Sequence, residues 1–273
     1  MPTDNVLKFY TETIQSSYLH YGYWDDPKNI EIDRMTVEDI RNAQERYIEN
    51  LTSFIPDDVK SILDVGCGIG GNTKFLLGKG YEVEALSPDD FQRSIISKKF
   101  KNEVPFHHCR FEQFQFNREF DLILESESAC YIKINEGFSK AREVLRLGGY
   151  LLASDYFVHF KDGSKSPHLK SSHDIERYLS TASTNGFELV TEFDQTENTM
   201  PTLDYGKYLV DRYMNPTIDY AILSAKKHYP FITYLMQKMF GEKLKLKKNQ
   251  TELIDSKLFR KYRKYMIFLF KKI

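Results

Sequence analysis

The feature that most constrains this chain is the stretch SILDVGCGIGGNTKFLLGKG, residues 61–80. It holds six of the fourteen glycines and includes a short apolar run directly before the first of them. A glycine-rich turn between a strand and a helix lets a ligand approach the backbone and the helix N-terminus. Two patterns fit the stretch: Gly66-x-Gly68-x-x-Gly71, typical of nicotinamide dinucleotide folds, and Asp64-x-Gly66-x-Gly68-x-Gly70, typical of loops that hold S-adenosylmethionine (SAM).

The charge of Asp64 separates these two interpretations. A pyrophosphate is negatively charged, so a carboxylate two residues before the first glycine would repel it. SAM carries an ammonium and a sulfonium, which the same carboxylate attracts. The second strand discriminates less, because Glu82 and Glu84 lie inside it and its tip is Ser87, whereas a dinucleotide fold needs an acid at the tip for the ribose. Asp64 therefore favours SAM.

From Ser61 onward, short β-like runs alternate with helical stretches, the pattern of a parallel sheet covered by helices. The sequence predicts a doubly wound α/β fold with a seven-stranded, mainly parallel sheet. The expected strands are 61–66, 82–86, 104–108, 120–126, 150–157, 187–194 and 265–272, and the expected helices are 71–78, 89–101, 135–146 and 172–185. Gly148-Gly149 and Asn185-Gly186 are expected to end the last two helices.

Two segments lie outside this alternation. Residues 1–55 are expected to be helical, since TVEDIRNAQERYIENLTSFI has apolar positions at helical spacing. We expect an N-terminal helical lid at 1–55, a SAM-binding core at 56–199 and 258–273, and a helical insertion at 200–257 that caps the substrate. The aromatic stripe at 205–240 fits either helix-to-sheet packing or a substrate pocket.

Composition narrows the class of protein. Apolar residues make up 41% and charged residues 28% of the 273 residues, an ordinary balance for a soluble globular protein. Three cysteines without CxxC spacing argue against a disulfide framework or a zinc site. The start MPTDNVLKFYTETIQ lacks the features of a signal peptide, and the longest apolar run, YMIFLF, is too short to span a bilayer. We therefore expect a cytoplasmic protein.

Several segments resemble known families. ILDVGCGIG resembles the first motif of class I SAM-dependent methyltransferases, and YLHYGYWDD (18–26) is similar to the N-terminal signature of sugar O-methyltransferases and of tocopherol and sterol C-methyltransferases. MTVEDIRNAQ, LSPDDFQ and CRFEQF resemble the mycolic-acid cyclopropane synthases. ESACYI (127–132) resembles the sterol and tocopherol enzymes, and EVLRLGGYLLASDYF (143–157) is a further feature of the family. The resemblance covers residues 16–195 and the last strand, and it implies the Rossmann-like methyltransferase fold.

The resemblance also implies the residues that bind the cofactor. The cyclopropane synthases have a small hydroxyl residue at the second strand tip and a glutamine five positions later on the ribose, which is the spacing of Ser87 and Gln92. Phe111 and Glu112 match an aromatic–acid pair that contacts adenine, with core packing as the alternative for Phe111. The loop around the methionine part of SAM then comprises Asp64, Gly66, Cys67, Gly68 and Gly70.

Methyl transfer needs an acceptor aligned with the sulfonium methyl and, at oxygen or carbon, removal of a proton. The ends of the fourth and fifth strands face that point in this fold. In similar relatives a histidine often occupies the position of Cys130 or Tyr131, so this chain departs from the pattern there. We expect Asp155 as the base or orienting acid, Tyr131 as a hydrogen-bonding helper and Glu127 as a carboxylate that favours the sulfonium. The alternatives are a turn-capping Asp155 and a Cys130 that is merely buried.

The N-terminal signature supplies aromatic residues for a lid. Tyr18 and Tyr23 are expected to contact the cofactor, because aromatic rings suit a sulfonium cation, and Tyr21 shares a side with Tyr23 in an extended segment. Trp24 fits either this lid or a staple between the N-terminal helices and the core. No metal site is expected, since the adjacent His107 and His108 point to opposite faces of a strand and the other histidines have no ligand spacing.

The C-terminal part is basic. Residues 241–273 hold eleven Lys and Arg against three Asp and Glu, although the net charge of the chain is -1. Residues 265–272 fit an antiparallel last strand. Residues 243–264 fit a solvated face, or a preference for an acyl, phosphate-bearing or membrane-held acceptor, including weak contact with an anionic membrane surface. Nothing resembles a nucleic-acid-binding module.

Together these features predict a SAM-dependent methyltransferase that methylates a carbon or oxygen of a small or lipid-like molecule and releases S-adenosylhomocysteine (SAH). We expect a monomer or homodimer with no nucleic-acid partner. Two alternatives remain. One is a SAM-binding protein of the same fold with non-methylating chemistry such as cyclisation, and the other is an NAD(P)-dependent oxidoreductase.

Overall fold

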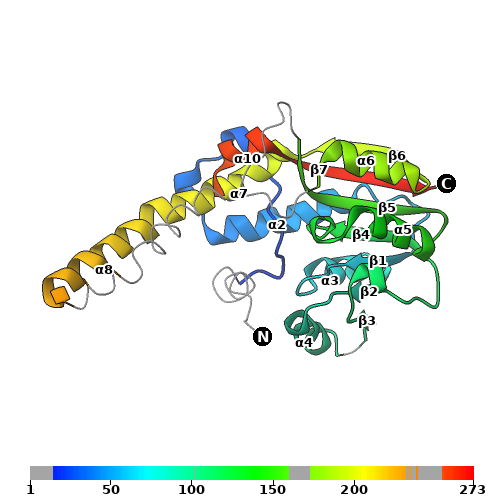
Figure 1. Cartoon of the computed structure of the whole chain (residues 1–273), viewed down its shortest axis with the longest axis horizontal. Helices are drawn as coiled ribbons and strands as arrows, with labels where there is room; N and C mark the ends of the chain where they lie inside the picture. Colours follow the sequence, from blue (N-terminus) through cyan, green and yellow to red (C-terminus); the bar gives the residue numbers. More distant parts are fainter. Residues whose placement is uncertain (1–14, 102, 160–172, 232–233, 235–237, 239–253) are drawn as a thin grey trace.

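The computed structural model contains a seven-stranded sheet with the strand order β3-β2-β1-β4-β5-β7-β6 (Figure 1). It describes the chain except for residues 1–14, 102, 160–172, 232–233, 235–237 and 239–253. Neighbours among β1 to β5 pair in parallel, and β7 is antiparallel to both β5 and β6. The strands are β1 (Ser61–Val65), β2 (Glu82–Leu86), β3 (Phe106–His107), β4 (Phe120–Ser126), β5 (Leu145–Val158), β6 (Phe187–Asp194) and β7 (Arg263–Lys272). Each overlaps a predicted strand, and the predicted fold class is confirmed.

The helices between the strands were also predicted, and local signals explain their starts. The side chains of Asp89 and Asp174 accept hydrogen bonds from the N–H groups of Gln92 and Arg177, so each caps a helix N-terminus. Gly70, with φ +76°, precedes another helix. The four helices are α3 (Gly71–Gly78), α4 (Asp90–Lys99), α5 (Ile134–Val144) and α6 (Ile175–Thr184).

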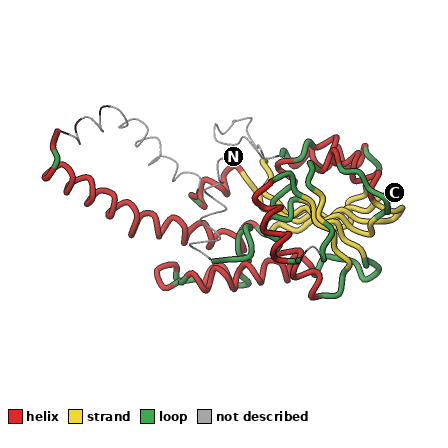
Figure 2. The backbone as a smooth tube through the Cα atoms, turned by 90° about the horizontal axis from the view of Figure 1, so that it is seen from below, coloured by secondary structure: helices red, strands yellow, loops and turns green. Residues whose placement is uncertain are grey.

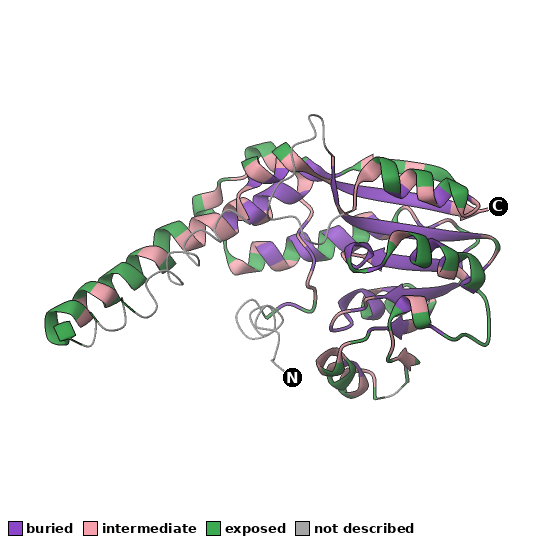
Figure 3. Cartoon of the chain, viewed as in Figure 1, coloured by how far each residue is buried: buried purple, intermediate pink, exposed green. Residues whose placement is uncertain are grey.

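Hydrophobic residues pack on both faces of the sheet, and most of its strand residues are buried (Figure 3). On one face, Phe138 of α5 and Tyr178 of α6 pack with Phe268 and Phe270 of β7. On the other face, the helix α2 (Val37–Thr52) contributes Tyr47, Ile48 and Leu51. Because both faces are covered, every residue of β1 is buried, which accounts for its nearly continuous apolar sequence.

The prediction that Gly148-Gly149 ends a helix is wrong. α5 already ends at Val144, and β5 runs from Leu145 through both glycines. Gly148 has φ +73°, and the pairing of β4 with β5 shifts register nearby. A Cβ on Gly149 would lie 3.0 Å from the carbonyl oxygen of Arg146. The two glycines therefore form an irregularity within the strand.

The described N-terminal region is only partly helical. Residues 15–26 form no helix, and two short 3-10 turns follow, η2 (Pro27–Asn29) and η3 (Ile32–Arg34). α2 begins at a capping box, in which Thr36 and Asp39 each accept a hydrogen bond from the backbone N–H of the other. Since α2 packs on the sheet, it belongs to the covering layer. The division into lid, core and cap stays a prediction.

The segment before β7 packs on the sheet at its start and then leaves it (Figure 2). Met200 and Leu203 are buried in the core, whereas Tyr213, Tyr220 and Leu223 are exposed. Tyr213 and the described rings after it therefore fit neither helix-to-sheet packing nor a substrate pocket. Much of 229–253 lies outside the described residues. The elements are α7 (Thr196–Leu209), a π-helical turn (Val210–Met214), α8 (Asn215–His228) and α10 (Ser256–Tyr262).

Candidate active site

The glycine-rich loop turns sharply between β1 and α3. Gly66, Gly68 and Gly70 have φ values of +74°, +55° and +76°, a region that favours glycine. A Cβ on Gly66 would lie 2.4 Å from Cβ of Ser128, so the loop also packs closely on the segment after β4. The N–H groups of Gly66 and Cys67 donate to the carbonyl of Leu86 at the end of β2. Glycine at these positions is therefore a requirement of the backbone.

A cavity of about 640 Å³ opens above this loop, at the carboxyl ends of β1, β2 and β4. Ligands of open parallel sheets bind at this edge. The predicted site residues that line it are Tyr18, Gly66, Cys67, Gly68, Ser87, Gln92, Phe111, Glu112, Glu127 and Tyr131. Those that do not line it are Asp64, Gly70, Tyr23 and Asp155.

Asp64 lies beneath the loop, where it does not line the cavity. Its carboxylate accepts a hydrogen bond of 2.6 Å from the hydroxyl of Thr73 on α3, and only 1% of the residue is exposed. Burial raises its pKa to about 6, although the bonds from Thr73 oppose the shift. Asp64 thus ties the loop to the start of α3, and the direct contact with a cofactor cation that we expected is not in place.

The tip of β2 carries the predicted hydroxyl–amide pair. Ser87 donates a hydrogen bond of 2.6 Å to Oε1 of Gln92, and the N–H of Asp89 donates to the Ser87 hydroxyl. Both side chains line the cavity. The amide nitrogen of Gln92 and the carboxylate of Asp89 provide a donor and acceptors, the chemistry that a ribose diol requires.

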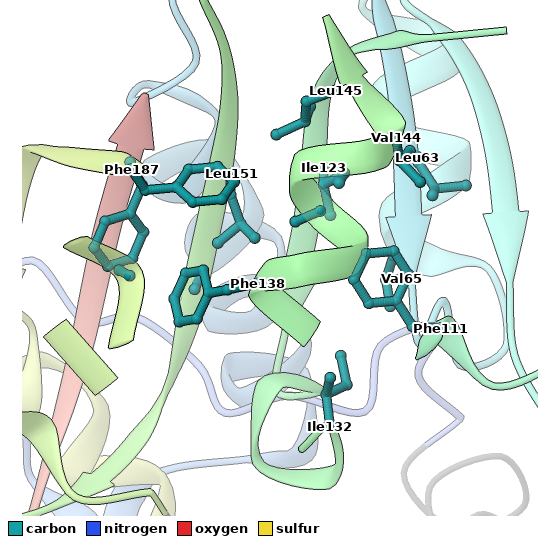
Figure 4. Packing of buried hydrophobic residues seen from close by; sticks show 14 of the residues in the cluster. Leu63, Val65, Phe111, Ile123, Ile132, Phe138, Val144, Leu145, Leu151 and Phe187 are labelled. Carbon is teal, nitrogen blue, oxygen red and sulfur yellow. The ribbon is translucent and has the colours of Figure 1, made fainter. Parts of the chain in front are cut away.

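Phe111 contributes both to the cavity and to the hydrophobic core. It is buried in the hydrophobic core, where it lies beside Val65 (Figure 4). Both residues also line the cavity, as does Ile132. The neighbouring Glu112 accepts a hydrogen bond from the N–H of Lys133, which connects the wall to the start of α5. The core-packing alternative and the predicted cavity position of Phe111 are therefore both realised, and the ring offers a flat surface to an adenine.

Glu127 is one of the acidic residues that line the cavity. It follows β4 with φ +50°, unusual for a residue with a side chain. Its Oε1 accepts hydrogen bonds from the hydroxyl of Tyr265 (2.6 Å) and from the N–H of Tyr21 (2.9 Å). Burial raises its pKa to about 7, and these two bonds limit the shift. Both of these bonds reach Oε1, and the residue lines the cavity.

A chain of buried hydroxyls supports Glu127 from behind. The Tyr265 hydroxyl lies 3.1 Å from that of Tyr47, which lies 2.7 Å from the hydroxyl of Ser154. Nε2 of Gln195 donates to Ser154. These residues come from α2, β5, β7 and the segment after β6. The sequence contains no local signal for the group, because long-range pairing alone brings its members together.

Asp155 is not placed to remove a proton from an acceptor. The residue is fully buried, and its two oxygens accept hydrogen bonds from the N–H groups of Cys130 (2.9 Å) and Tyr156 (2.7 Å). Burial raises its pKa to about 6, against the effect of both bonds. The geometry fits the turn-capping alternative. Asp155 fixes the turn that carries the exposed Tyr131, and Cys130 is buried.

The N-terminal segment forms one wall of the cavity through Tyr18 and Tyr21. Tyr23 does not reach it. Its N–H donates to the carbonyl of Ala43, and Nε1 of Trp24 donates to Thr202, which supports the staple interpretation of Trp24. Both contacts join the N-terminal segment to the layer formed by α2 and α7.

Sequence reasoning missed His20 and Asn72 in this wall. Nδ1 of His20 contacts the carbonyl of Tyr21, Nε2 lies 3.2 Å from Oδ1 of Asn72, and both residues line the cavity. Burial lowers the pKa of His20 to about 4, so its ring is neutral. The signal was the YLHYGYW signature, in which we considered histidine only as a metal ligand. Asn72, at the start of α3, extends the glycine motif by one residue.

The charges around the cavity distinguish the candidate cofactors. Among the described residues, its wall carries the carboxylates of Asp89, Glu112 and Glu127 against one guanidinium, Arg110. A dinucleotide needs positive charge or free N–H groups for its pyrophosphate, whereas SAM is a cation. The cavity wall also contains the pair Ser87–Gln92, which suits a ribose, and the ring of Phe111. The residues present therefore fit SAM.

Comparison with known proteins agrees with this chemistry. Residues 63–153 match the family described as the methyltransferase domain. The chain carries a class I SAM-dependent methyltransferase domain. The cofactor of such a domain is SAM, which agrees with the charges on the cavity wall. The match runs from the middle of β1 through β2, β3 and β4 into β5.

One relative of this methyltransferase domain is named for a small-molecule substrate. A probable tocopherol O-methyltransferase from Oryza sativa subsp. japonica is 38% identical over 131 residues, which are 43% of this chain but 34% of that protein. The match thus spans about a third of that relative's length.

Two solved structures share the fold over nearly the whole chain. A putative sarcosine dimethylglycine methyltransferase from Galdieria sulphuraria has a TM-score of 0.71 at 16% identity and covers 98% of each chain. The (4+2)-cyclase SpnF has a TM-score of 0.67 at 16% identity and covers 98% of this chain and 95% of its own. These similarities show the fold alone.

Within the described ranges, no three His, Cys, Asp or Glu side chains gather closely enough to bind a metal ion. No helix in the described part of the chain combines the length and apolarity needed to cross a membrane.

Proposed function

We propose that this chain is a methyltransferase that transfers a methyl group from SAM to a carbon or oxygen of a small or lipid-like molecule. The observation that carries the proposal is the excess of carboxylates on the wall of a cavity above the glycine loop, with Glu127 between that loop and the N-terminal wall. The methyltransferase domain and the tocopherol relative support the same reaction class, and nothing in the comparisons supports an oxidoreductase.

Glu127 is suited to accept the proton of the acceptor. When bound, SAM supplies an electrophilic methyl group on a cationic sulfur. Oε1 of Glu127 is held by Tyr21 and Tyr265, so Oε2 has a fixed position at the cavity wall. A carboxyl group with a pKa of about 7 matches the pH of the cell, where a base is most effective. The nearby negative charge also favours a cation in the cavity.

The other residues near the carboxyl ends of β4 and β5 have supporting roles. Tyr131 and Tyr156 line the cavity with rings that exclude water and direct the acceptor. Asp155 is a positioning residue, because it binds the N–H groups of Cys130 and Tyr156 and thereby holds the backbone on both sides of that wall.

A second candidate function is non-methylating chemistry such as cyclisation on the same scaffold. It is favoured by the similarity to SpnF and by the absence of a histidine at positions 130 and 131. The two functions differ in one outcome, since only a methyltransferase converts SAM to SAH during turnover.

Cellular context remains part of this proposal. We place the protein in the cytoplasm, as a monomer or homodimer without a nucleic-acid partner. Weak contact with an anionic membrane surface through 243–264 is proposed on the basic composition of that segment. Half of these residues, 243–253, lie outside the described ranges.

The test is methyl transfer itself. The purified chain is incubated with methyl-labelled SAM and a panel of phenols, isoprenoids, fatty acids and sterols, and label in the extracted products is counted. The proposal predicts SAM-dependent label in at least one class, and its loss in Glu127→Gln while calorimetry still detects SAH binding. Acceptor consumption with no SAH formed would favour the cyclisation alternative.

A further inference from the structure

Arg263 lies beside Tyr156 near the cofactor cavity, and among the described residues it forms no ion pair within 4 Å of an acid. It begins β7 and is partly buried, and its Nε is a buried donor without a hydrogen-bond partner among the described residues. Its guanidinium lies over two rings, with Cζ 5.0 Å from the centre of Tyr156 and 5.8 Å from that of Phe259. A buried unsatisfied donor on a charged group is costly, so its persistence requires an explanation.

The neighbouring cations are paired. Arg260 binds both carboxylate oxygens of Glu197 at 2.9 Å, and Lys264 lies 2.9 Å from Asp194. Asp155 also lies near Arg263, but its two oxygens already accept backbone hydrogen bonds. Burial lowers the pKa of Arg263. Within this basic stretch, Arg263 therefore differs from Arg260 and Lys264, and general surface charge does not account for it.

The ring of Tyr156 separates Arg263 from the cofactor cavity. Tyr156 lines that cavity, and the guanidinium of Arg263 stacks on its ring. Phe259 also packs against Tyr156 and Tyr21, with ring centres 6.3 Å and 6.4 Å apart. An acceptor that enters beside Glu127 and crosses the edge of Tyr156 would reach the guanidinium over an aromatic surface.

We propose that Arg263 binds an anionic group, a carboxylate or a phosphate, on the methyl acceptor. This inference rests on the proposed function and specifies its substrate class: an apolar molecule with one anionic end. Arginine binds both groups with two parallel N–H···O bonds, for which an unpartnered Nε and a terminal nitrogen are suited. The rings of Tyr156, Tyr21 and Phe259 would contact the apolar part. Neither the family match nor the relatives assign this residue.

The experiment measures binding to the SAH-loaded full-length chain. Octanoate, octyl phosphate and octanol are titrated calorimetrically, because they share a chain and differ in the head group. The wild-type protein should bind at least one of the two anions about tenfold or more tightly than octanol. Arg263→Gln should remove that preference and leave octanol affinity unchanged, and Arg263→Lys should retain part of it.

Arg260→Gln is the matched control, since it removes a cation from the same segment that is already paired with Glu197. It should bind both anions as the wild type does. The two anions distinguish the head groups, because a carboxylate-bearing acceptor predicts tighter octanoate binding and a phosphate-bearing one tighter octyl phosphate binding.

Two results would overturn the inference: equal affinity of the wild type for octanol and for both anions, or unchanged anion affinity in Arg263→Gln. SAH titration of each variant and its melting temperature show whether folding and the cofactor site are intact. Failure of the wild type to bind SAH would instead count against the proposed function.

Discussion

The hydroxyl of Tyr265, on the last strand, donates a hydrogen bond of 2.6 Å to Oε1 of Glu127, which directly follows the fourth strand. The two residues are 138 positions apart in the chain. The bond links the antiparallel β7 to the cavity wall. It holds the carboxylate that we propose as the base, and it lowers a pKa that burial alone would raise further.

Tyr265→Phe therefore tests the role of Glu127. Loss of the donor raises the pKa of Glu127 above its value of about 7. A base acts when deprotonated, so the rate of the wild type should rise through about pH 7, and the midpoint should move to higher pH in the variant. The pH dependence of kcat/KM measures this shift. Glu127→Gln should lower kcat/KM about a hundredfold or more at every pH. An unchanged pH dependence of kcat/KM in Tyr265→Phe would exclude Glu127 as the base.

The N-terminal wall rests directly on Gly71. A Cβ there would lie 2.3 Å from the carbonyl oxygen of Ser17 and 2.6 Å from the ring of Tyr18. Gly71→Ala should displace this wall at a cost of about 1–3 kcal/mol and weaken SAH binding about tenfold. Gly78→Ala in the same helix, where nothing lies within 4 Å of the added Cβ, should leave SAH affinity unchanged. Equal affinities of the two variants would show that the wall does not contribute.

Ser87 and Gln92 should act as a unit on the ribose. Each alanine variant should lose about 0.5–1.5 kcal/mol of SAH binding. Because Ser87 donates to Gln92, the double variant should lose less than the two single variants together. Calorimetric titration of the four proteins gives this coupling. Ser94→Ala, which removes an exposed hydroxyl of the same helix, is the control, and strict additivity would contradict the pairing.

Glu125 should make the fold less stable as the pH rises. Burial, and then the charge of Asp155, raise its pKa from 4.5 to about 8, so the folded state keeps a proton that the unfolded state releases. Between these pH values each unit costs about 1.4 kcal/mol of unfolding free energy. Glu125→Gln, which keeps the shape, should be more stable than the wild type at pH 8 and similar at pH 5. Urea unfolding of both proteins at both pH values measures this, and a Glu125→Gln variant that is no more stable than the wild type at pH 8 would refute it.

Much of the fold was readable from the sequence because each signal is local. Apolar runs such as 61–66 and 120–126 predicted strands that the structure confirms, and the helices predicted at 89–101 and 172–185 are present as α4 and α6. Gly148-Gly149 was misread, because a glycine pair suits a helix end as well as a strand irregularity. Only the pairing of β4 with β5 decides between them, and that pairing is not local.

Part of the candidate active site could also be predicted from the sequence. Gly66 and Gly68 of the loop and the pair Ser87–Gln92 follow from contiguous motifs, and the structure places them at the cavity, whereas Gly70 does not line it. Asp155 was misjudged because the direction of a side chain at a strand end depends on which N–H groups lie beside it. The turn at 129–131 supplies one of them. Tyr265 was missed for a related reason, since only the antiparallel return of β7 brings it to Glu127.

The central claim is that the carboxylate-lined cavity holds SAM. Its most direct test is calorimetric titration of the purified chain with SAM, SAH and NADH in parallel. The account predicts micromolar binding of SAM and SAH and no binding of NADH, because three carboxylates face the cavity against one arginine. Binding of NADH without binding of SAM or SAH would contradict it.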